Sequence, residues 1–499
     1  MKRYGLILWV LVFVLECAGT VLAKDNLIVV DQYDATTLDP IAHNDVPSSR
    51  ACYEIYDTLV FFDNEGKVSP GLAESWEFLS GTDYKFNLRK GVKFHNGEEL
   101  KAADVQYSIK RATTGAGAKI ATFSQNVEDV EIVDDYTVIV RLKKVDYSFF
   151  SSLSHSWASI VNQKATEAAG ESYGMNPVGT GPFKFVSWQK GSKYIFERFE
   201  DYWGPKPKYK TLEVRSVPES TSRTIALETE DADIAFPIAH NDLKRVEENP
   251  GLILYRRPQN STAYIGFNAS KKPFDDVNVR HAIFAALDIV GIQAASYRGV
   301  GKVPGTLVPS TIKYSINEEI PPHVRDIEKA KKLLVEAGVA DLKLEIWSNE
   351  RKERVDSATI IQAQLEEIGI QTEIKVLEWG AYVNGLMEQQ HDLFILGWVS
   401  AVPDPNFAIS GLLESTAIPA SNLTFYRDPK LDSLLDKGRS LPDGDERAAV
   451  YRELQLYINE QLPMIYLHND ESIAGTQKNV KGFAPRSNEI HSFREVYFE

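Results

Sequence analysis

The sequence predicts an α/β fold, and three observations lead to that prediction. Short segments in which apolar and polar residues alternate are typical of half-buried strands, and they fill the first half of the chain. In the second half, segments with helical spacing of apolar residues end at glycines and are followed by apolar, strand-like runs. Strand, helix and strand in that order are typical of βαβ units in a parallel sheet.

Residues 1–23 have the parts of a secretory signal peptide. Lys2 and Arg3 give a positive start, residues 6–15 form an unbroken apolar run, and residues 21–23 offer a cleavage site after Ala23. The apolar run is too short to cross about 30 Å of hydrocarbon as a helix. We therefore expect cleavage after Ala23 and export of the mature chain. Export would leave Cys52 as the single cysteine, so no internal disulfide can form.

The first half of the mature chain is predicted to be rich in strands and turns. Residues 27–30 form a short apolar strand that ends in a polar run. Residues 84–89 alternate with a period of two, which predicts a half-buried strand. Residues 131–142 predict two strands around a turn, and residues 183–188 and 194–199 predict a hairpin.

The second half is predicted to contain more helix. Apolar residues at helical spacing predict helices that end at Gly338 and Gly369, where a left-handed residue stops the helix. Apolar strands are predicted at 342–347, 370–377 and 391–398. Because ligands of open α/β sheets bind beyond the carboxyl ends of strands, the loop 399–405 is a candidate binding site on physical grounds alone.

Composition and charge restrict the classes of protein that remain. The 499 residues are 43% hydrophobic and 11% aromatic, which excludes a collagen-like or disordered chain. The net charge is −15, or −16 once Lys2, Arg3 and Glu16 are removed with the signal. A net-acidic surface repels phosphate backbones, so we expect no nucleic-acid partner.

Motifs of catalysis are not found in the sequence. No two of the nine histidines lie within four residues of each other, so no helical zinc pair is present. The segment 310–313 matches S-x-x-K, but it lies in a proline-rich loop and no Lys-Thr-Gly partner follows it. We therefore predict no enzyme activity, no metal and no cofactor. A secreted α/β hydrolase stays open as an alternative of a different class.

Six sequence blocks, spread over nearly the whole mature chain, carry a resemblance to a known family. They are 72–76 with 84–97 and 102–108, 176–183, 202–204, 266–268 with 273–274 and 279–280, 397–398 with 403–405, and 462–466. In this order and behind a signal peptide, they resemble the family 5 extracellular solute-binding proteins of peptide-type ABC importers. Most matched residues have a scaffold role as well, such as the core aromatics Trp76 and Phe86. The resemblance is therefore stronger for fold than for site.

This resemblance implies a periplasmic protein with two lobes, the type II binding-protein fold in its large peptide-binding subclass. Lobe one would combine residues 24–262 with 469–499 and carry an extra subdomain at about 57–185, and lobe two would be residues 263–468. Ligand binding would close the lobes about the two chain crossings. The implied partners are the membrane permease subunits of an ABC importer, with its cytoplasmic ATPases, and the protein would act as a monomer.

The ligand suggested by the resemblance is a short peptide or a glutathione-like solute. Peptide-binding members hold the ligand ammonium with an aspartate in the loop after Gly397-Trp398, but that position is Ala401 here. The expected binding residues lie at the ends of predicted strands, and Arg351 and Arg354 suit the carboxylates of the glutathione-binding branch. They are Tyr33, Asp34, Arg351, Arg354, Trp398 and Asp404. A nickel chelate, haem or an opine remains the alternative ligand.

Overall fold

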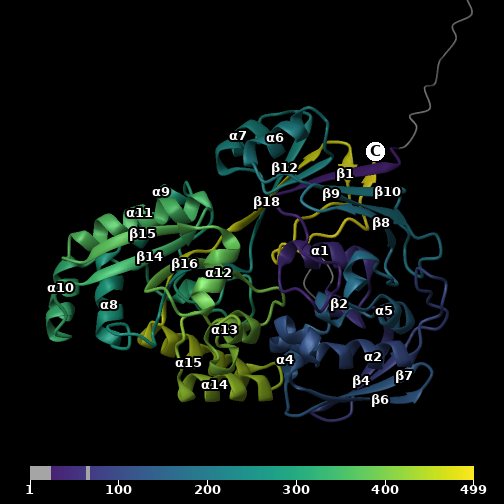
Figure 1. Cartoon of the computed structure of the whole chain (residues 1–499), viewed down its shortest axis with the longest axis horizontal. Coiled ribbons are helices and arrows are strands. Elements are labelled where there is room, and N and C mark those ends of the chain that lie inside the picture. Colours follow the sequence, from purple (N-terminus) through teal and green to yellow (C-terminus); the bar gives the residue numbers. More distant parts are fainter. Residues whose placement is uncertain (1–23, 63–67) are drawn as a thin grey trace, which may run out of the picture.

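A seven-stranded sheet and a five-stranded sheet form the centres of two lobes that lie side by side in the computed structural model (Figure 1). The structure describes residues 24–62 and 68–499, so the predicted signal peptide lies outside the described residues. Helices and sheets are mixed in both lobes. The predicted α/β fold with two lobes is therefore confirmed.

Lobe one is built on the seven-stranded sheet, in the order β12-β18-β11-β1-β10-β9-β8. The central strand β1 (Asn26–Asp31) runs parallel to β10 (Thr211–Ser216) and to β11 (Ile234–Phe236). The remaining strands are β8 (Phe183–Gln189), β9 (Lys193–Arg198), β12 (Leu252–Pro258) and β18 (Glu471–Gln477). Helices α1 (Val46–Ile55), α6 (Ser220–Glu228) and α7 (Leu243–Glu247) belong to this lobe, as do the short strands β19 (Val480–Lys481) and β20 (Tyr497–Phe498).

A subdomain is inserted between β1 and β8 and lies below the seven-stranded sheet in Figure 1. Its four-stranded antiparallel sheet has the order β4-β5-β7-β6. These strands are β4 (Ala73–Phe78), β5 (Asp83–Leu88), β6 (Val127–Asp134) and β7 (Thr137–Leu142), and a hairpin of β2 (Val60–Phe62) and β3 (Val68–Pro70) precedes them. Its helices are α2 (Ala102–Ala112), α3 (Ala121–Ser124), α4 (Tyr147–Ser152) and α5 (Gln163–Ala169).

Lobe two is the segment between β12 and β18, built on a sheet of order β15-β14-β16-β13-β17. Its strands are β13 (Ser261–Phe267), β14 (Lys343–Asn349), β15 (Gln371–Leu377), β16 (Leu393–Val399) and β17 (Met464–His468). Strand β14 is parallel to both β15 and β16, as the βαβ pattern predicts. The crossover helices are α11 (Lys352–Glu366) and α12 (Trp379–Met387).

Further helices cover both faces of the five-stranded sheet of lobe two. They are α8 (Val277–Ala286), α9 (Ile289–Ser296), α10 (Ile327–Glu336), α13 (Pro405–Leu413), α14 (Pro429–Ser440) and α15 (Asp445–Gln461). Gly338 and Gly369 follow α10 and α11 with φ of 67° and 84°, so both glycines take the left-handed conformation predicted for them. Within the described residues no single helix is long and apolar enough to cross a membrane, whereas α8 and α9 together would pass by length and composition but are bent by 58°.

The chain crosses between the lobes at two points. It passes from β12 to β13 through Gln259 and Asn260, and returns from β17 to β18 through Asn469 and Asp470. The Asn469 side chain donates hydrogen bonds from Nδ2 to the Ser261 carbonyl (2.7 Å) and to Thr262 Oγ1 (2.9 Å). The two crossings are therefore tied to each other, and they form one narrow connection.

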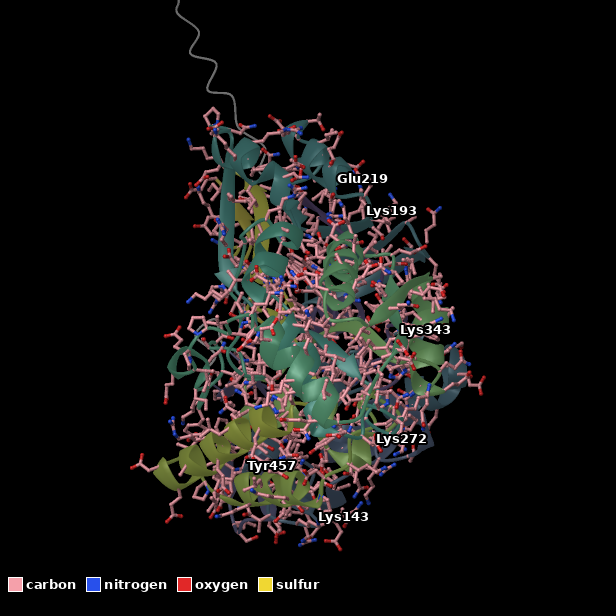
Figure 2. The ribbon with its side chains drawn as sticks, turned by 90° about the vertical axis from the view of Figure 1, so that its left-hand side faces the viewer. Lys143, Lys193, Glu219, Lys272, Lys343 and Tyr457 are labelled. Carbon is pink, nitrogen blue, oxygen red and sulfur yellow. The ribbon has the colours of Figure 1, made fainter. Side chains whose placement is uncertain are left out.

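Charged side chains surround both lobes. Figure 2 shows Lys143, Glu219, Lys272 and Lys343 on the outside of the molecule, and all four are exposed.

Cys52, by contrast, is fully buried in α1, with its Sγ 3.6 Å from Nε2 of His43. It therefore behaves as a small core residue.

Candidate functional site

The strand ends of both sheets meet at the two chain crossings. In lobe two, β14 and β16 are parallel, so Asn349 and Val399 lie at the same edge of the sheet, and the start of antiparallel β13 pairs with Val399 at that edge. In lobe one, the carboxyl ends of β1 and β11 pair at Asp31 and Phe236. The start of β18 lies at this edge as well. Loops that follow parallel strands therefore face each other across the crossings, which is where open α/β sheets bind ligands.

Arg351 joins this edge of lobe two to the crossing. Its Nε lies 3.0 Å from Oε2 of Glu353, and its Nη2 lies 3.3 Å from Oδ2 of Asp470. Oδ1 of Asp470 lies 3.3 Å from Nε2 of His468 and 4.0 Å from Nε2 of His240. Burial alone would raise the pKa of Asp470, but His468 and Arg351 hold that pKa below its usual range. Asp470 is thus ionised, and Arg351 already has two carboxylate partners.

Arg354 differs from Arg351 because it has no carboxylate partner among residues 24–62 and 68–499. It is 9% exposed and lies in the first turn of α11, where its Nη1 donates to Oδ1 of Asn349 at 2.9 Å. It forms no ion pair with any Asp or Glu of the described residues. Burial lowers the pKa of this guanidinium, and the charge of Arg351 lowers it further. A buried cation without a counter-charge is costly, so the site is suited to an anionic group from outside the chain.

Gly397 lies next to the Arg354 guanidinium. A Cβ atom at position 397 would lie 3.4 Å from Nη2 of Arg354, which is an ordinary van der Waals contact. The next residue, Trp398, turns away from Arg354 because its Nε1 donates to the Phe407 carbonyl at 3.2 Å. Its half-buried ring lies against Gly411 of α13. Trp398 therefore supports α13 from the strand end.

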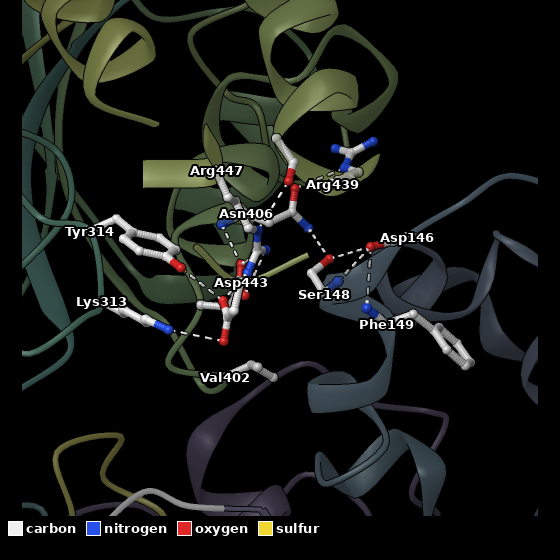
Figure 3. Close-up of polar contacts among 12 residues, drawn as sticks. Asp146, Ser148, Phe149, Lys313, Tyr314, Val402, Asn406, Arg439, Asp443 and Arg447 are labelled. Carbon is white, nitrogen blue, oxygen red and sulfur yellow. Dashed lines mark hydrogen bonds and ion pairs between the residues drawn. The ribbon is translucent and has the colours of Figure 1, made fainter. Parts of the chain in front are cut away.

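Asp404 holds the start of α13. Its side chain accepts a hydrogen bond from the Asn406 backbone N–H at 2.9 Å, which caps the helix. Both carboxylate oxygens also accept from Nη2 of Arg447, at 3.1 Å and 2.9 Å. Figure 3 shows Arg447 extending toward this loop and toward Asp443. The buried Asp404 is thus occupied by groups of its own lobe, and its predicted contact with ligand remains a prediction.

The loop before α13 and its first turn bridge lobe two to the subdomain. Val402 and Phe407 are buried within the apolar core of the subdomain, where Phe407 stacks on Phe123 with ring centroids 5.2 Å apart. Nδ2 of Asn406 donates to Oγ of Ser148 in α4 at 3.1 Å, as Figure 3 shows. We call Val402, Asn406 and Phe407 the lobe contact. It joins lobe two directly to the subdomain.

Tyr33 and Asp34 follow β1, and the structure gives them different surroundings. Tyr33 is 52% exposed, and its phenol interacts electrostatically with Arg354 across the two lobes. Asp34 instead accepts hydrogen bonds on Oδ2 from Nε1 of Trp188 at 3.0 Å and from the backbone N–H of Gly191 at 2.7 Å. Both donors belong to the β8–β9 hairpin. The structure therefore leaves Tyr33 exposed and engages Asp34 within lobe one.

Several residues at this site were not predicted from the sequence. Asp470 and His468 meet His240 at the crossing, although His240 is far from both in the chain. One feature of the sequence could have indicated Asp470 as a site residue, because it comes two residues after a buried strand. Among the residues that the structure describes, no group of three His, Cys, Asp or Glu side chains is placed to hold a metal ion.

Comparisons with known proteins agree on one family. Residues 67–419 match the bacterial extracellular solute-binding proteins, family 5 Middle. Haem-binding protein A of Haemophilus influenzae is 33% identical over 86% of this chain and 84% of its own length. Glutathione-binding protein GsiB of Pectobacterium atrosepticum is 29% identical over 95% of this chain and 94% of its own.

A solved structure shows the same relationship. The ABC transporter-associated periplasmic binding protein DppA from Helicobacter pylori, in complex with the peptide STSA, matches with a TM-score of 0.89 and 30% sequence identity. The match covers 96% of this chain and 98% of that one. The family model spans most of the chain, and both lobes are shared with this structure. The chain belongs to family 5 of the bacterial extracellular solute-binding proteins.

Proposed function

We propose that this chain captures a short peptide or a glutathione-like solute in the periplasm and delivers it to the permease of an ABC importer. The single observation that carries this proposal is Arg354, a buried guanidinium at the strand ends between the lobes, with no carboxylate partner in the described part of the chain. A ligand carboxylate would supply the missing counter-charge in a bidentate pair. Peptides and glutathione both carry such a group.

Relatives support the same ligand class. The Helicobacter pylori protein was solved with a peptide, and the Pectobacterium relative is named for glutathione. Haem, which the Haemophilus influenzae relative is named for, also carries carboxylates and is therefore the second candidate. Arg354 would pair with a carboxylate of any of these three ligands. Direct binding measurements are therefore needed to tell which of them the protein takes.

The mechanism we propose is closure of two lobes on a ligand. Lobe two would correspond to residues 263–468, and lobe one to 24–262 with 469–499, in a mature monomer that begins after Ala23. Only two chain segments connect these units. A ligand bound to Arg354 of lobe two gains contacts with Tyr33 of lobe one only when the lobes are together, so binding shifts the population toward the closed state. The permease would recognise that closed form.

The first test is a thermal-shift screen of the mature protein with dipeptides, tetrapeptides, glutathione, haem, an opine and a nickel chelate. Because ligand binds the folded state alone, a peptide or glutathione at about 100 times its Kd adds about 2.7 kcal/mol to the free energy of unfolding. We expect a higher Tm for that class only. Mass spectrometry should recover the ligand unchanged, whereas a hydrolysed product would favour the secreted hydrolase.

Small-angle scattering tests the closure itself. The radius of gyration of the ligand-free protein is expected to fall when the ligand found by the thermal screen is added at saturation. Phe407→Ala should weaken this change, because it removes a stacked ring from the lobe contact and thus about 1.5–3 kcal/mol of apolar burial. We expect Phe407→Ala to bind ligand about tenfold or more weakly.

Phe483→Ala provides the matched control for Phe407→Ala. Phe483 is 4% exposed and lies in the core of lobe one, on the other side of the chain crossings. Its loss should lower the Tm without changing the scattering response to ligand. Equal effects of the two substitutions on closure would contradict the role of the lobe contact, and unchanged dimensions of the wild type would contradict closure.

A further inference from the structure

Glu489 lies on the return segment of lobe one, directly beside the loop that follows β16. The neighbouring Asn488 donates from Nδ2 to the carbonyl of Ala401 in lobe two at 3.0 Å. The carbonyl of Ser487 accepts from the Asn260 backbone N–H at the first crossing, at 2.7 Å. The segment 487–489 therefore contacts both a chain crossing and the loop in which Ala401 stands.

The backbone of Glu489 is held in place by Arg50 of α1. The Arg50 guanidinium donates to the Glu489 carbonyl, from Nε at 3.1 Å and from Nη2 at 2.6 Å. Its Nη1 forms a buried ion pair with Asp31 at the end of β1. Arg50 thus pairs with the Asp31 carboxylate and donates to the backbone of residue 489. It donates no hydrogen bond to the side chain of Glu489.

The carboxyl group of Glu489 lacks a cationic partner among the residues that the structure describes. Its side chain is 16% exposed, and Oε1 is buried and makes no hydrogen bond within the described residues, although the hydroxyl of Ser472 lies beside the group. The nearest basic atom to Oε2 is Nε2 of His491 at 3.9 Å. Burial drives the pKa of His491 well below its usual value, so that ring is neutral.

The groups around Glu489 come from every element packed against it. Arg50 of α1 lowers its pKa, while Asp31 of β1 and Asp470 at the second crossing raise it. Burial is the largest influence, and the pKa of Glu489 is raised to about 7. The ligand-free site therefore holds a buried carboxyl group whose ionised form a positively charged partner would stabilise.

The backbone at residue 489 adopts a conformation that is unfavourable for a residue with a side chain. Glu489 has a φ of 62°, in the left-handed region that glycine adopts without penalty. For a residue with a Cβ this conformation costs about 1–2 kcal/mol. Strain of this kind in a non-glycine residue is typical of functional sites, where the side chain itself is needed.

We propose that Glu489 is the counter-charge for the ammonium group of the ligand, in place of the carboxylate that Ala401 does not offer. The inference rests on the proposed function, since it assigns the residue that binds the other charged end of the ligand in the same site. Arg354 of lobe two would take the ligand carboxylate and Glu489 of lobe one its ammonium. The ligand is then a zwitterion, held by one charge from each lobe, and neither lobe alone satisfies both of its ends.

The test compares ligands with and without the ammonium group on the wild type and on Glu489→Gln. The probes are the peptide Ser-Thr-Ser-Ala, glutathione, and the N-acetylated form of each, with affinities from calorimetry at pH 8. We expect the wild type to prefer a free amine by at least about 30-fold. In Glu489→Gln the preference should fall to about threefold or less, while the acetylated probes keep their wild-type affinity.

Two further variants separate a binding role from a structural one. Glu489→Gly relieves the strained φ and should raise the Tm of the free protein while losing the amine preference as Glu489→Gln does. Glu499→Gln removes an exposed carboxylate of the same terminal segment and should keep the preference. An amine preference that survives in both Glu489 variants overturns this proposal alone. Failure of every probe to bind the wild type overturns it together with the proposed function.

Discussion

Arg354→Met is expected to weaken binding of carboxylate-bearing ligands at least about 30-fold while leaving the free protein at least as stable as the wild type. The free protein buries the Arg354 guanidinium with one hydrogen bond to Asn349 and no ion pair among the described residues. Replacing an unpaired buried cation by an apolar side chain of similar length removes a desolvation cost. Removing that cation from a ligand pair costs about 2–5 kcal/mol.

Two measurements on the same variant check this expectation. Thermal unfolding of Arg354→Met without ligand should give a Tm equal to or above that of the wild type. Calorimetry with the ligand identified by screening should show at least about a 30-fold loss of affinity. A stable variant that still binds a carboxylate ligand with wild-type affinity would refute the role of Arg354.

Arg351→Ala serves as the comparison for Arg354→Met. We expect it to weaken binding as well, but by a different route, because Arg351 is already paired with Glu353 and Asp470. Its removal leaves the Asp470 carboxylate buried with less compensation, so the free protein should lose stability. Without ligand, the Tm of Arg351→Ala should therefore be lower than that of Arg354→Met. Identical Tm values for the two variants would contradict this assignment.

The fold could be predicted from the sequence because its signals are local. Alternation in 84–89 and the glycines after α10 and α11 each report on a few neighbouring residues, and they were sufficient for an α/β fold. The relation between lobes is not local. The burial of Phe407 in the core of the subdomain joins residues far apart in the chain, and no period or motif in the sequence indicates it.

The candidate site was predictable only in part, for the same reason. Arg351 and Arg354 follow a strand and begin a helix, and the structure places both at the edge where the lobes meet. Sequence position alone could not tell which of them is paired, since Asp470 approaches from 119 residues away. Likewise, Asp404 follows a strand-end loop as a binding residue does, and its partner Arg447 is revealed only by packing.

Arg447→Met is expected to destabilise the protein by about 3–5 kcal/mol at neutral pH, because it leaves the buried Asp404 carboxylate without its cation. Arg447 and Asp404 have side chains only 4% and 10% exposed. Arg447 also donates to the Gly438 carbonyl and to Asp443, as Figure 3 shows for the latter, so it ties the loop before α13 to α14 and α15. Denaturant unfolding measures the loss.

The pH dependence follows from the state of Asp404. Burial raises the pKa of Asp404 in the folded protein, although Arg447 opposes that effect. A carboxyl group whose folded pKa is raised favours folding when it is protonated, and this contribution is lost as the pH rises through its folded pKa. In Arg447→Met that pKa rises further, so the difference in stability from the wild type should be largest at pH 7–8 and should shrink toward pH 4.

Asp404→Asn and the double variant complete the prediction. Asparagine caps a helix as well as aspartate does, so Asp404→Asn keeps the start of α13 and removes the charge alone. Its cost should be smaller than that of Arg447→Met, because Arg447 retains Asp443. The double variant should be more stable than the sum of the two losses, since it contains no unpaired buried charge. Strict additivity would contradict the ion pair, and loss of the preference for a free amine in Asp404→Asn would move the ammonium site from Glu489 to Asp404.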